Sequence, residues 1–193
     1  MNTSLAYKFK DEHWEKEWDL VALPTDTLMD LLSKNPDRDN GCQCEISLLT
    51  LEKYTYQFNL FGEDLPYDEL MDGTSEESLS LELKIQMNDV EYYDKSETQL
   101  IQIGQLFEMK LRQYRNEIAA ILTPLFSDAD DSEEQSSIDM SCECVDEEFI
   151  VTFYIHIAQV QSLKGATTLE VIYEQFVQLH GVVNKANEVA KLF

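Results

Sequence analysis

The chain has 193 residues, 44% of them hydrophobic, and its 38 acidic against 14 basic side chains give a formal net charge of −24. Length and apolar content fit one folded domain and argue against a wholly disordered chain. The acidity argues against direct binding to nucleic acid or to an anionic membrane, because both need a cationic surface. A basic protein, a basic peptide or a multivalent cation is the favoured partner. In the competing interpretation, the acidity only keeps the protein soluble.

No export signal or membrane span is expected. The first twenty residues lack the uninterrupted apolar stretch of a secretory signal, and no apolar run is long enough to cross a bilayer. We therefore expect a cytoplasmic protein. Its four cysteines form two C-x-C pairs, and in that compartment we expect reduced thiols rather than a disulfide framework. The pairs are Cys42 with Cys44 and Cys142 with Cys144.

Hydrophobic periodicity places both helical and β segments in the first half of the chain. Tyr54, Tyr56, Phe58 and Leu60 alternate with polar residues, which is the pattern of a strand with one buried face. The two tryptophans lie one helical turn apart, which favours a helix or a tight loop around them. The predicted segments are an edge strand at 5–10, a helix or tight loop at 11–19, a helix at 25–34, a hairpin at 42–60, an acidic loop at 62–77 and a strand at 79–87.

The second half begins and ends with a long helical pattern. Leu100, Ile103 and Phe107 recur at three- and four-residue steps, which is typical of an amphipathic helix. Thr167 and Glu170 form a capping-box pattern at the start of the last helix. The predicted segments are a helix at 97–126, an acidic loop at 127–137, strands at 138–145 and 149–159, and a C-terminal helix from 167.

Together these segments predict an α+β fold, with a single antiparallel sheet of about five strands and two long helices packed on one of its faces. We expect one acidic domain over 1–193. In each half, a helix precedes a C-x-C strand and a hairpin, and the two C-x-C pairs are 100 residues apart. This repetition suggests a pseudo-repeat of 25–87 and 97–160, although identity outside the cysteine pairs is slight.

The two C-x-C pairs have three interpretations. Four thiolates could form a tetrahedral zinc site, and two close thiols could form a redox pair. However, residues i and i+2 of a strand point to the same face, so each cysteine pair shares its face with apolar neighbours. Cysteine is among the most buried residue types and packs as a small hydrophobe. Core packing is therefore the favoured interpretation, and no zinc is predicted.

The second acidic loop partly resembles a calcium-binding loop. Asp128, Asp130 and Ser132 occupy alternate positions, and Asp139 stands where the twelfth-position carboxylate of an EF-hand loop would fall. The sixth position needs glycine in such a loop, and here it is Glu133. A strand pattern follows instead of a second helix. We therefore predict no metal site in this loop.

No motif indicates catalysis. His13, His156 and His180 lack metal-ligand spacing, and the sequence contains no G-x-S-x-G, P-loop or G-x-G-x-x-G pattern. Carboxylates are so numerous that finding two that could act as an acid–base pair carries no information. We predict a protein that is not an enzyme and that needs no cofactor.

Acidic residues are concentrated in two segments without basic residues. Eight lie between Lys53 and Lys84, and eleven lie between Arg115 and Lys164. Such a surface accelerates encounters with a basic partner, and salt weakens the effect. The competing interpretation is a solvated acidic surface with mobile loops. The predicted partner-binding residues are Glu63, Asp64, Asp68, Glu69, Asp72, Glu76, Glu77, Asp128, Asp130, Asp131, Glu133 and Glu134.

The sequence therefore predicts a non-enzymatic protein that neutralises or inhibits a basic partner, such as a nuclease or another nucleic-acid-binding protein. Rows of carboxylates can imitate the charge density of phosphates, so nucleic-acid mimicry is one mechanism. In overall composition the chain resembles DNA-mimic inhibitors, phage anti-defence proteins and acidic immunity or antitoxin proteins. The alternative is an adaptor or secretion-type chaperone that binds a partner protein through apolar surface.

Overall fold

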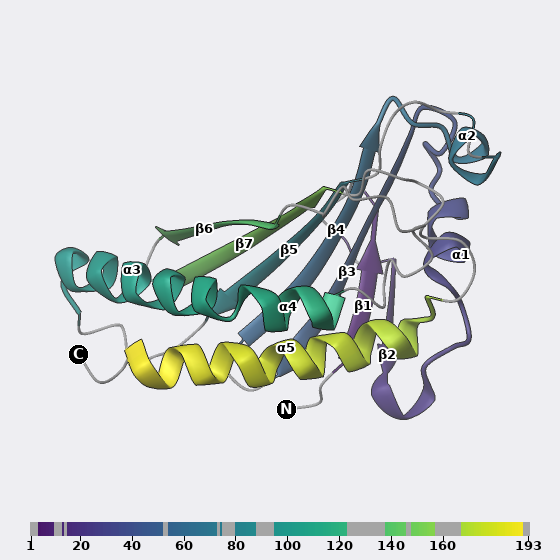
Figure 1. Ribbon diagram of the computed structural model, residues 1–193. Coiled ribbons are helices and arrows are strands. Elements are labelled where there is room, and N and C mark those ends of the chain that lie inside the picture. Colours follow the sequence, from purple (N-terminus) through teal and green to yellow (C-terminus); the bar gives the residue numbers. More distant parts are fainter. Residues whose placement is uncertain are drawn as a thin grey trace.

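The computed structural model describes residues 4–9, 13, 15–51, 54–72, 74, 80–87, 95–122, 138–145, 148–156 and 167–190. Seven strands of this part of the chain form one sheet, in the order β2-β1-β3-β4-β5-β7-β6, and every neighbouring pair is antiparallel. The α+β class and the single antiparallel sheet are thus confirmed (Figure 1). The strands are β1 (Ser4–Lys8), β2 (Lys16–Asp19), β3 (Gly41–Leu51), β4 (Tyr54–Glu63), β5 (Ser80–Met87), β6 (Ile138–Val145) and β7 (Glu148–His156).

The sheet is wider than the expected five strands because an N-terminal hairpin extends one edge. β2 lies where the tryptophan spacing favoured a helix or a tight loop. Its Trp18 is only 8% exposed and stacks on Tyr7 of β1, with ring centroids 5.1 Å apart. This contact between two strands outweighs the local helical spacing, because burying an aromatic ring is a large apolar gain. A 3-10 turn (Leu20–Ala22) follows β2.

Alternating residues form one apolar face on β1 to β5, the strands with described side chains. The strand registers align a row of seven apolar residues, one from each strand, and the first five, whose side chains the structure describes, are buried. Successive residues of a strand point to opposite faces, so the residues between them form a polar face. The row runs Trp18, Leu5, Leu48, Tyr56, Ile85, Val151 and Cys142.

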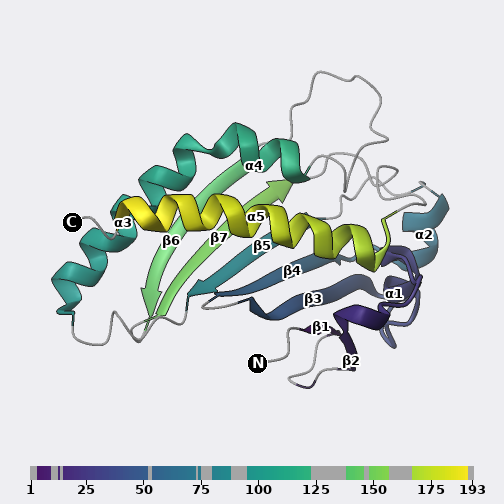
Figure 2. The same cartoon turned by 90° about the horizontal axis from the view of Figure 1, so that it is seen from below.

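Three helices lie on this apolar face: α3 (Glu97–Gln113), α4 (Arg115–Leu122) and α5 (Leu169–Ala190). Seen from below, α5 runs across the sheet with α3 and α4 beside it (Figure 2). The expected helix at 97–126 is divided at Tyr114, the C-cap of α3, and α4 begins at the next residue. The break lets α3 pack against β6 and α5 while α4 continues along α5.

α5 supplies aromatic contacts to the centre of the core. The rings of Phe58 and Phe176 stack with centroids 4.5 Å apart, and both side chains are at most 2% exposed. Polar groups at this interface are paired as well. The Asn187 side-chain amide donates to the Tyr54 hydroxyl at 2.7 Å, and His180 Nδ1 lies 2.8 Å from the Tyr56 hydroxyl. The helix is thus fixed to the sheet by both stacking and hydrogen bonds.

Two short helices, α1 (Leu28–Ser33) and α2 (Tyr67–Asp72), lie at one end of the sheet (Figure 1). α1 begins with a capping box in which Thr27 and Asp30 exchange hydrogen bonds. An isolated bridge between Thr27 and Thr168 joins the start of α1 to the start of α5. The position of α1 is therefore coupled to that of the main core helix.

The single-domain assignment over 1–193 and the pseudo-repeat of 25–87 and 97–160 stay predictions. The expected acidic loop at 127–137 lies outside the described residues. Within the residues that the structure does describe, no helix is both long enough and apolar enough to cross a membrane.

The Phe58–Phe176 stack predicts a large loss of stability for Phe176→Ala. Removing a fully buried ring should lower the free energy of unfolding by about 3–5 kcal/mol, measured by chemical denaturation. Val177→Ala is the matched control, because the neighbouring side chain is 43% exposed. We expect it to change stability by no more than about 0.5 kcal/mol. Equal losses in both variants would contradict this account of the core.

Candidate acidic binding site

Four of the predicted partner-binding residues lie together near one end of the sheet. Asp64 follows β4, and Asp68, Glu69 and Asp72 belong to α2; all four are exposed. Glu63 is the last residue of β4, but the structure does not describe its side chain. The remaining seven lie outside the described residues: Glu76, Glu77, Asp128, Asp130, Asp131, Glu133 and Glu134.

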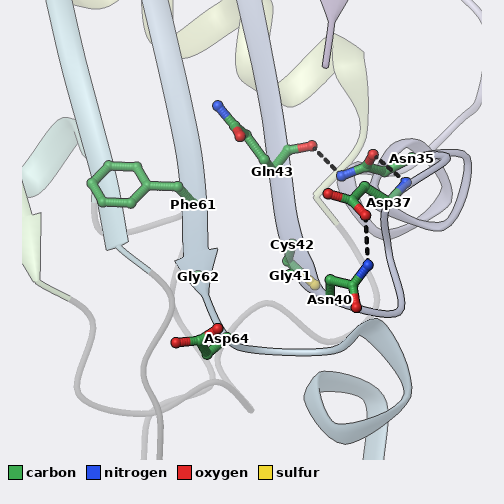
Figure 3. Close-up of a pocket in the computed structure, with 9 residues that line it drawn as sticks. All are labelled: Asn35, Asp37, Asn40, Gly41, Cys42, Gln43, Phe61, Gly62 and Asp64. Atoms are coloured by element: carbon green, nitrogen blue, oxygen red, sulfur yellow. Dashed lines mark hydrogen bonds between the residues drawn. The ribbon is translucent and has the colours of Figure 1, made fainter. Parts of the chain in front are cut away.

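A pocket of about 410 Å³ opens beside Asp64, where β3 begins and β4 ends (Figure 3). Its volume lies in the range of roughly 300–1,000 Å³ that is typical of small-molecule sites. In Figure 3, Phe61 and Asp64 lie on the β4 side, and Asp37 and Asn40 lie beyond β3. The remaining lining residues are Asn35, Gly41, Cys42, Gln43 and Gly62.

Asn35 fixes the loop that forms one wall of this pocket. Its side chain is almost fully buried; its amide nitrogen donates to the Gln43 carbonyl at 3.2 Å, and its oxygen accepts from the Asp37 N–H at 3.0 Å. The Asn40 side chain then donates to Asp37 Oδ1 at 2.7 Å. Asparagine and aspartate often close turns in this way, because their side chains mimic the backbone. The wall is thus held by a connected set of hydrogen bonds.

The second wall of the pocket is formed by the end of β4 and Asp64, and it lies close to the first wall. Gly41 is paired with Glu63, and a Cβ at position 41 would lie 3.0 Å from the Gly62 carbonyl oxygen. Asp64 has a φ of 58°, in the left-handed region, so the chain turns sharply after β4. The Tyr67 N–H at the start of α2 donates to the Arg38 carbonyl at 2.9 Å, which ties α2 to the first wall.

The charges at this end are predominantly negative. Asp39 and the four acids of the β4–α2 segment are exposed around the pocket, and Arg38 is the nearby cation. Arg38 lies 3.8 Å from Asp39 and also donates to the Ser33 carbonyl. Among the described residues, no lysine or arginine forms an ion pair with Asp64, Asp68, Glu69 or Asp72. We call these four residues, with Asp37 and Asp39, the acidic end.

Elsewhere, four of the described basic residues form ion pairs with acids. Lys34 contacts Asp26, and this hydrogen bond raises the pKa of Lys34 above its ordinary value. The other pairs are Lys8 with Glu45, Arg112 with Glu108 and Lys185 with Glu117. Ion pairs therefore neutralise several of the described basic side chains outside the acidic end.

The cysteine pairs do not converge. Cys42 and Cys44 lie in β3, while Cys142 and Cys144 lie in β6, and three strands separate β3 from β6. At about 4.8 Å per strand step, the two strands are roughly 19 Å apart, too far for one four-thiolate zinc site. Cys42 and Cys44 are at most 1% exposed, as the core interpretation predicted. The structure does not describe the side chains of the second pair.

The histidines lie in separate places. His13 is exposed, and His156 is the last residue of β7. His180 is held between Tyr56 and Asn184, whose side chains lie 2.8 Å from its two ring nitrogens. These contacts give His180 a structural role between α5 and the sheet. Among the described residues, no group of three or more His, Cys, Asp or Glu side chains could hold a metal ion.

Of the nine residues that line the pocket, only Cys42 and Asp64 are among the residues singled out from the sequence. Asn35, Asp37 and Asn40 lie between the predicted helix at 25–34 and the predicted hairpin at 42–60, and Phe61 lies just after that hairpin. The signal at Phe61 was present in the strand pattern. Phe61 stands in the polar series of β4, after Thr55, Gln57 and Asn59, and its side chain is 38% exposed.

Asn35→Ala should destabilise the protein by about 1–3 kcal/mol, because it leaves the Gln43 carbonyl and the Asp37 N–H without their partner. Asn35→Asp retains the acceptor for the Asp37 N–H but loses the donor, so we expect an intermediate loss. Asn116→Ala, at an exposed position of α4, is the control. Denaturant midpoints provide the measurement, and an Asn35→Ala variant as stable as the control would refute the proposed wall.

Native Cys42 and Cys44 should react slowly with iodoacetamide at pH 8. Burial raises the pKa of the Cys42 thiol to about 11, and burial, with a smaller effect of Glu45, also raises the pKa of Cys44. Only the thiolate reacts, so both low accessibility and low ionisation oppose labelling. Mass spectrometry of the labelled peptide should show at least tenfold slower modification than in urea. Comparable rates in the two conditions would contradict core packing of this pair.

Comparison with known proteins reveals no relative from which a function could be transferred. The chain matches no protein-family model, no curated protein and no solved structure.

Proposed function

We propose that the protein is a non-enzymatic binding protein that covers a basic surface of another protein. The acidic end is the contact surface. Partners of suitable chemistry are nucleases and other nucleic-acid-binding proteins, because their binding surfaces are lined with lysine and arginine. Covering that surface would neutralise or inhibit the partner in competition with nucleic acid, as an antitoxin, immunity or anti-defence protein does.

The observation that carries the proposal is the arrangement of charge at the acidic end. Asp64, Asp68, Glu69 and Asp72 are exposed, close in sequence and without ion pairs among the described residues. Several cations elsewhere are already paired, so self-neutralisation is weaker at this end. Unpaired exposed carboxylates beside a preformed pocket favour a partner with several positive charges.

The free thiols of Cys42 and Cys44 suit a reducing compartment. We therefore propose that binding takes place in the cytoplasm. Direct binding to nucleic acid or to an anionic membrane is disfavoured by the same charge that favours a basic protein.

An adaptor or secretion-type chaperone is the second candidate, and one observation favours it. Ile101 and Met109 of α3 are 48% and 47% exposed, and their spacing of eight residues places them on the same side of the helix. A partner that docks on this side would be held by apolar contacts. Its affinity would change little with salt, in contrast to binding at the acidic end.

Neutralising the acidic end should weaken binding to the basic partner captured from the native host's lysate. The variant Asp64→Asn, Asp68→Asn, Glu69→Gln and Asp72→Asn removes four exposed charges. Exposed ion pairs contribute about 0.2–1 kcal/mol each, so we expect about tenfold or greater loss of affinity at low salt. Isothermal titration calorimetry at several salt concentrations measures both the affinity and its salt dependence.

The matched control removes four exposed charges elsewhere: Glu15→Gln, Glu170→Gln, Glu174→Gln and Glu188→Gln. Both variants have the same net charge, so a non-specific electrostatic effect would weaken them equally. A specific acidic end predicts that only the first variant loses affinity steeply. Unchanged affinity in the first variant, or binding that persists at high salt, would overturn the proposal and favour the adaptor.

A further inference from the structure

We propose that the outer edge of β6 binds an extended segment of a partner protein, which adds to the sheet as a further strand and carries basic residues four positions apart. β6 is the outermost strand on the side of the sheet away from β2 (Figure 1). Two strands, β5 and β7, separate it from β4, the strand that leads into the acidic end. This contact is therefore a second binding surface, and it does not depend on the function proposed for the acidic end.

The observation that carries the inference is the backbone of β6 itself. β6 pairs with β7 along its whole length of eight residues, from Ile138 opposite Ile155 to Val145 opposite Glu148. In an antiparallel strand, the N–H and C=O groups of alternate residues point to opposite sides, so half of them point away from β7. Among the strands that the structure describes, none pairs with that outer side. Such a row of backbone donors and acceptors is a template for strand addition.

The two edges of the sheet differ in how well they suit an added strand. β2, at the other edge, has only four residues, and short edge strands are one way in which proteins prevent unwanted pairing. β6 is twice as long and offers correspondingly more backbone hydrogen bonds. α3 packs against β6, so this edge is supported by the helical layer. Strand addition is therefore favoured at β6.

The sequence of β6 indicates which kind of strand can add. Its charged residues are Asp139 and Glu143, four positions apart. Antiparallel pairing of two copies of β6, centred on Ser141, would place Asp139 of each copy opposite Glu143 of the other. Like charges directly opposite each other destabilise a strand pair, so a second copy of this chain is disfavoured. Lysine or arginine opposite both acids would form attractive pairs instead, and apolar residues suit the positions opposite Met140 and Cys142.

The probe for this edge is the capped heptapeptide Val-Lys-Val-Thr-Val-Lys-Val. Paired antiparallel with 138–144, it places its two lysines opposite Glu143 and Asp139. Hydrogen–deuterium exchange of the full-length protein should slow over 138–145 when this peptide is present at saturating concentration. Exchange over 61–72, at the acidic end, should stay unchanged.

Two N-methylated versions of the peptide test backbone pairing at constant charge. One carries N-methyl groups on the lysines and the threonine, and the other carries them on the second and third valines. Only one of these two sets of amides can point toward β6 in a strand pair. We expect exactly one version to bind about tenfold more weakly than the parent peptide or worse, since its amides can no longer donate to β6.

A charge exchange tests the choice of partner. Asp139→Lys combined with Glu143→Lys should bind the lysine peptide about tenfold more weakly and should bind its glutamate counterpart, Val-Glu-Val-Thr-Val-Glu-Val, more tightly than the unmodified protein does. The control combines Glu174→Lys with Glu188→Lys, at exposed positions of α5, and has the same net charge. It should leave the preference for the lysine peptide in place. Thermal melting verifies that both variants are folded.

Three results would overturn the inference. In the first, the two N-methylated peptides bind equally well or equally poorly, which would show that backbone pairing is not involved. In the second, the two charge variants respond alike, which would show that the position of the acids does not matter. In the third, the lysine peptide slows exchange over 61–72 instead of 138–145, which would exclude the edge of β6 and support the acidic end.

Discussion

The packing of α5 on one face of the sheet is the constraint on which the rest of the structure depends. The Phe58–Phe176 stack and the hydrogen bonds of Tyr54 and Tyr56 fix this helix to β4. Its start is joined to α1 through the Thr27–Thr168 bridge, and α1 leads into the loop that Asn35 holds. The core thereby positions one wall of the pocket, while β4 itself carries the other. Acidic side chains can gather at this end because none of them is needed for the core.

Much of the fold could be predicted from periodicity. The alternation in β3, β4 and β5 identified these strands within a few residues, because each has a single buried face. α5 begins at Leu169, and Thr168 rather than the predicted Thr167 accepts the hydrogen bond of the first turn, from the Val171 N–H. β2 was missed because its conformation depends on the stacking of Trp18 on Tyr7, a contact with another strand. α2 was not predicted because its segment is acidic and shows no repeating apolar pattern; Leu70 is the buried residue of this helix. The break at Tyr114 has no proline or glycine to signal it.

The candidate site was predictable only in part. The net charge and the clustering of acidic residues in the sequence pointed to Asp64 and to the acids of α2. Such clusters can be recognised without knowledge of the fold. The pocket could not be predicted, because its walls come from segments that only the pairing of β3 with β4 brings together. The Asn35-Pro36-Asp37 turn and the outward Phe61 were the available signals. Neither signal predicts a pocket by itself, because the strand register is needed to show that the two segments lie next to each other.

Hydrogen–deuterium exchange of the complex with the captured basic partner tests the central claim most directly. The account predicts slower exchange over 35–43 and 61–72 in the complex, with no change at the exposed side of α3 between Ile101 and Met109. Raising the salt concentration should remove the protection as the complex dissociates. Protection centred on α3, persisting at high salt, would contradict the acidic end as the contact surface and identify an apolar docking protein instead.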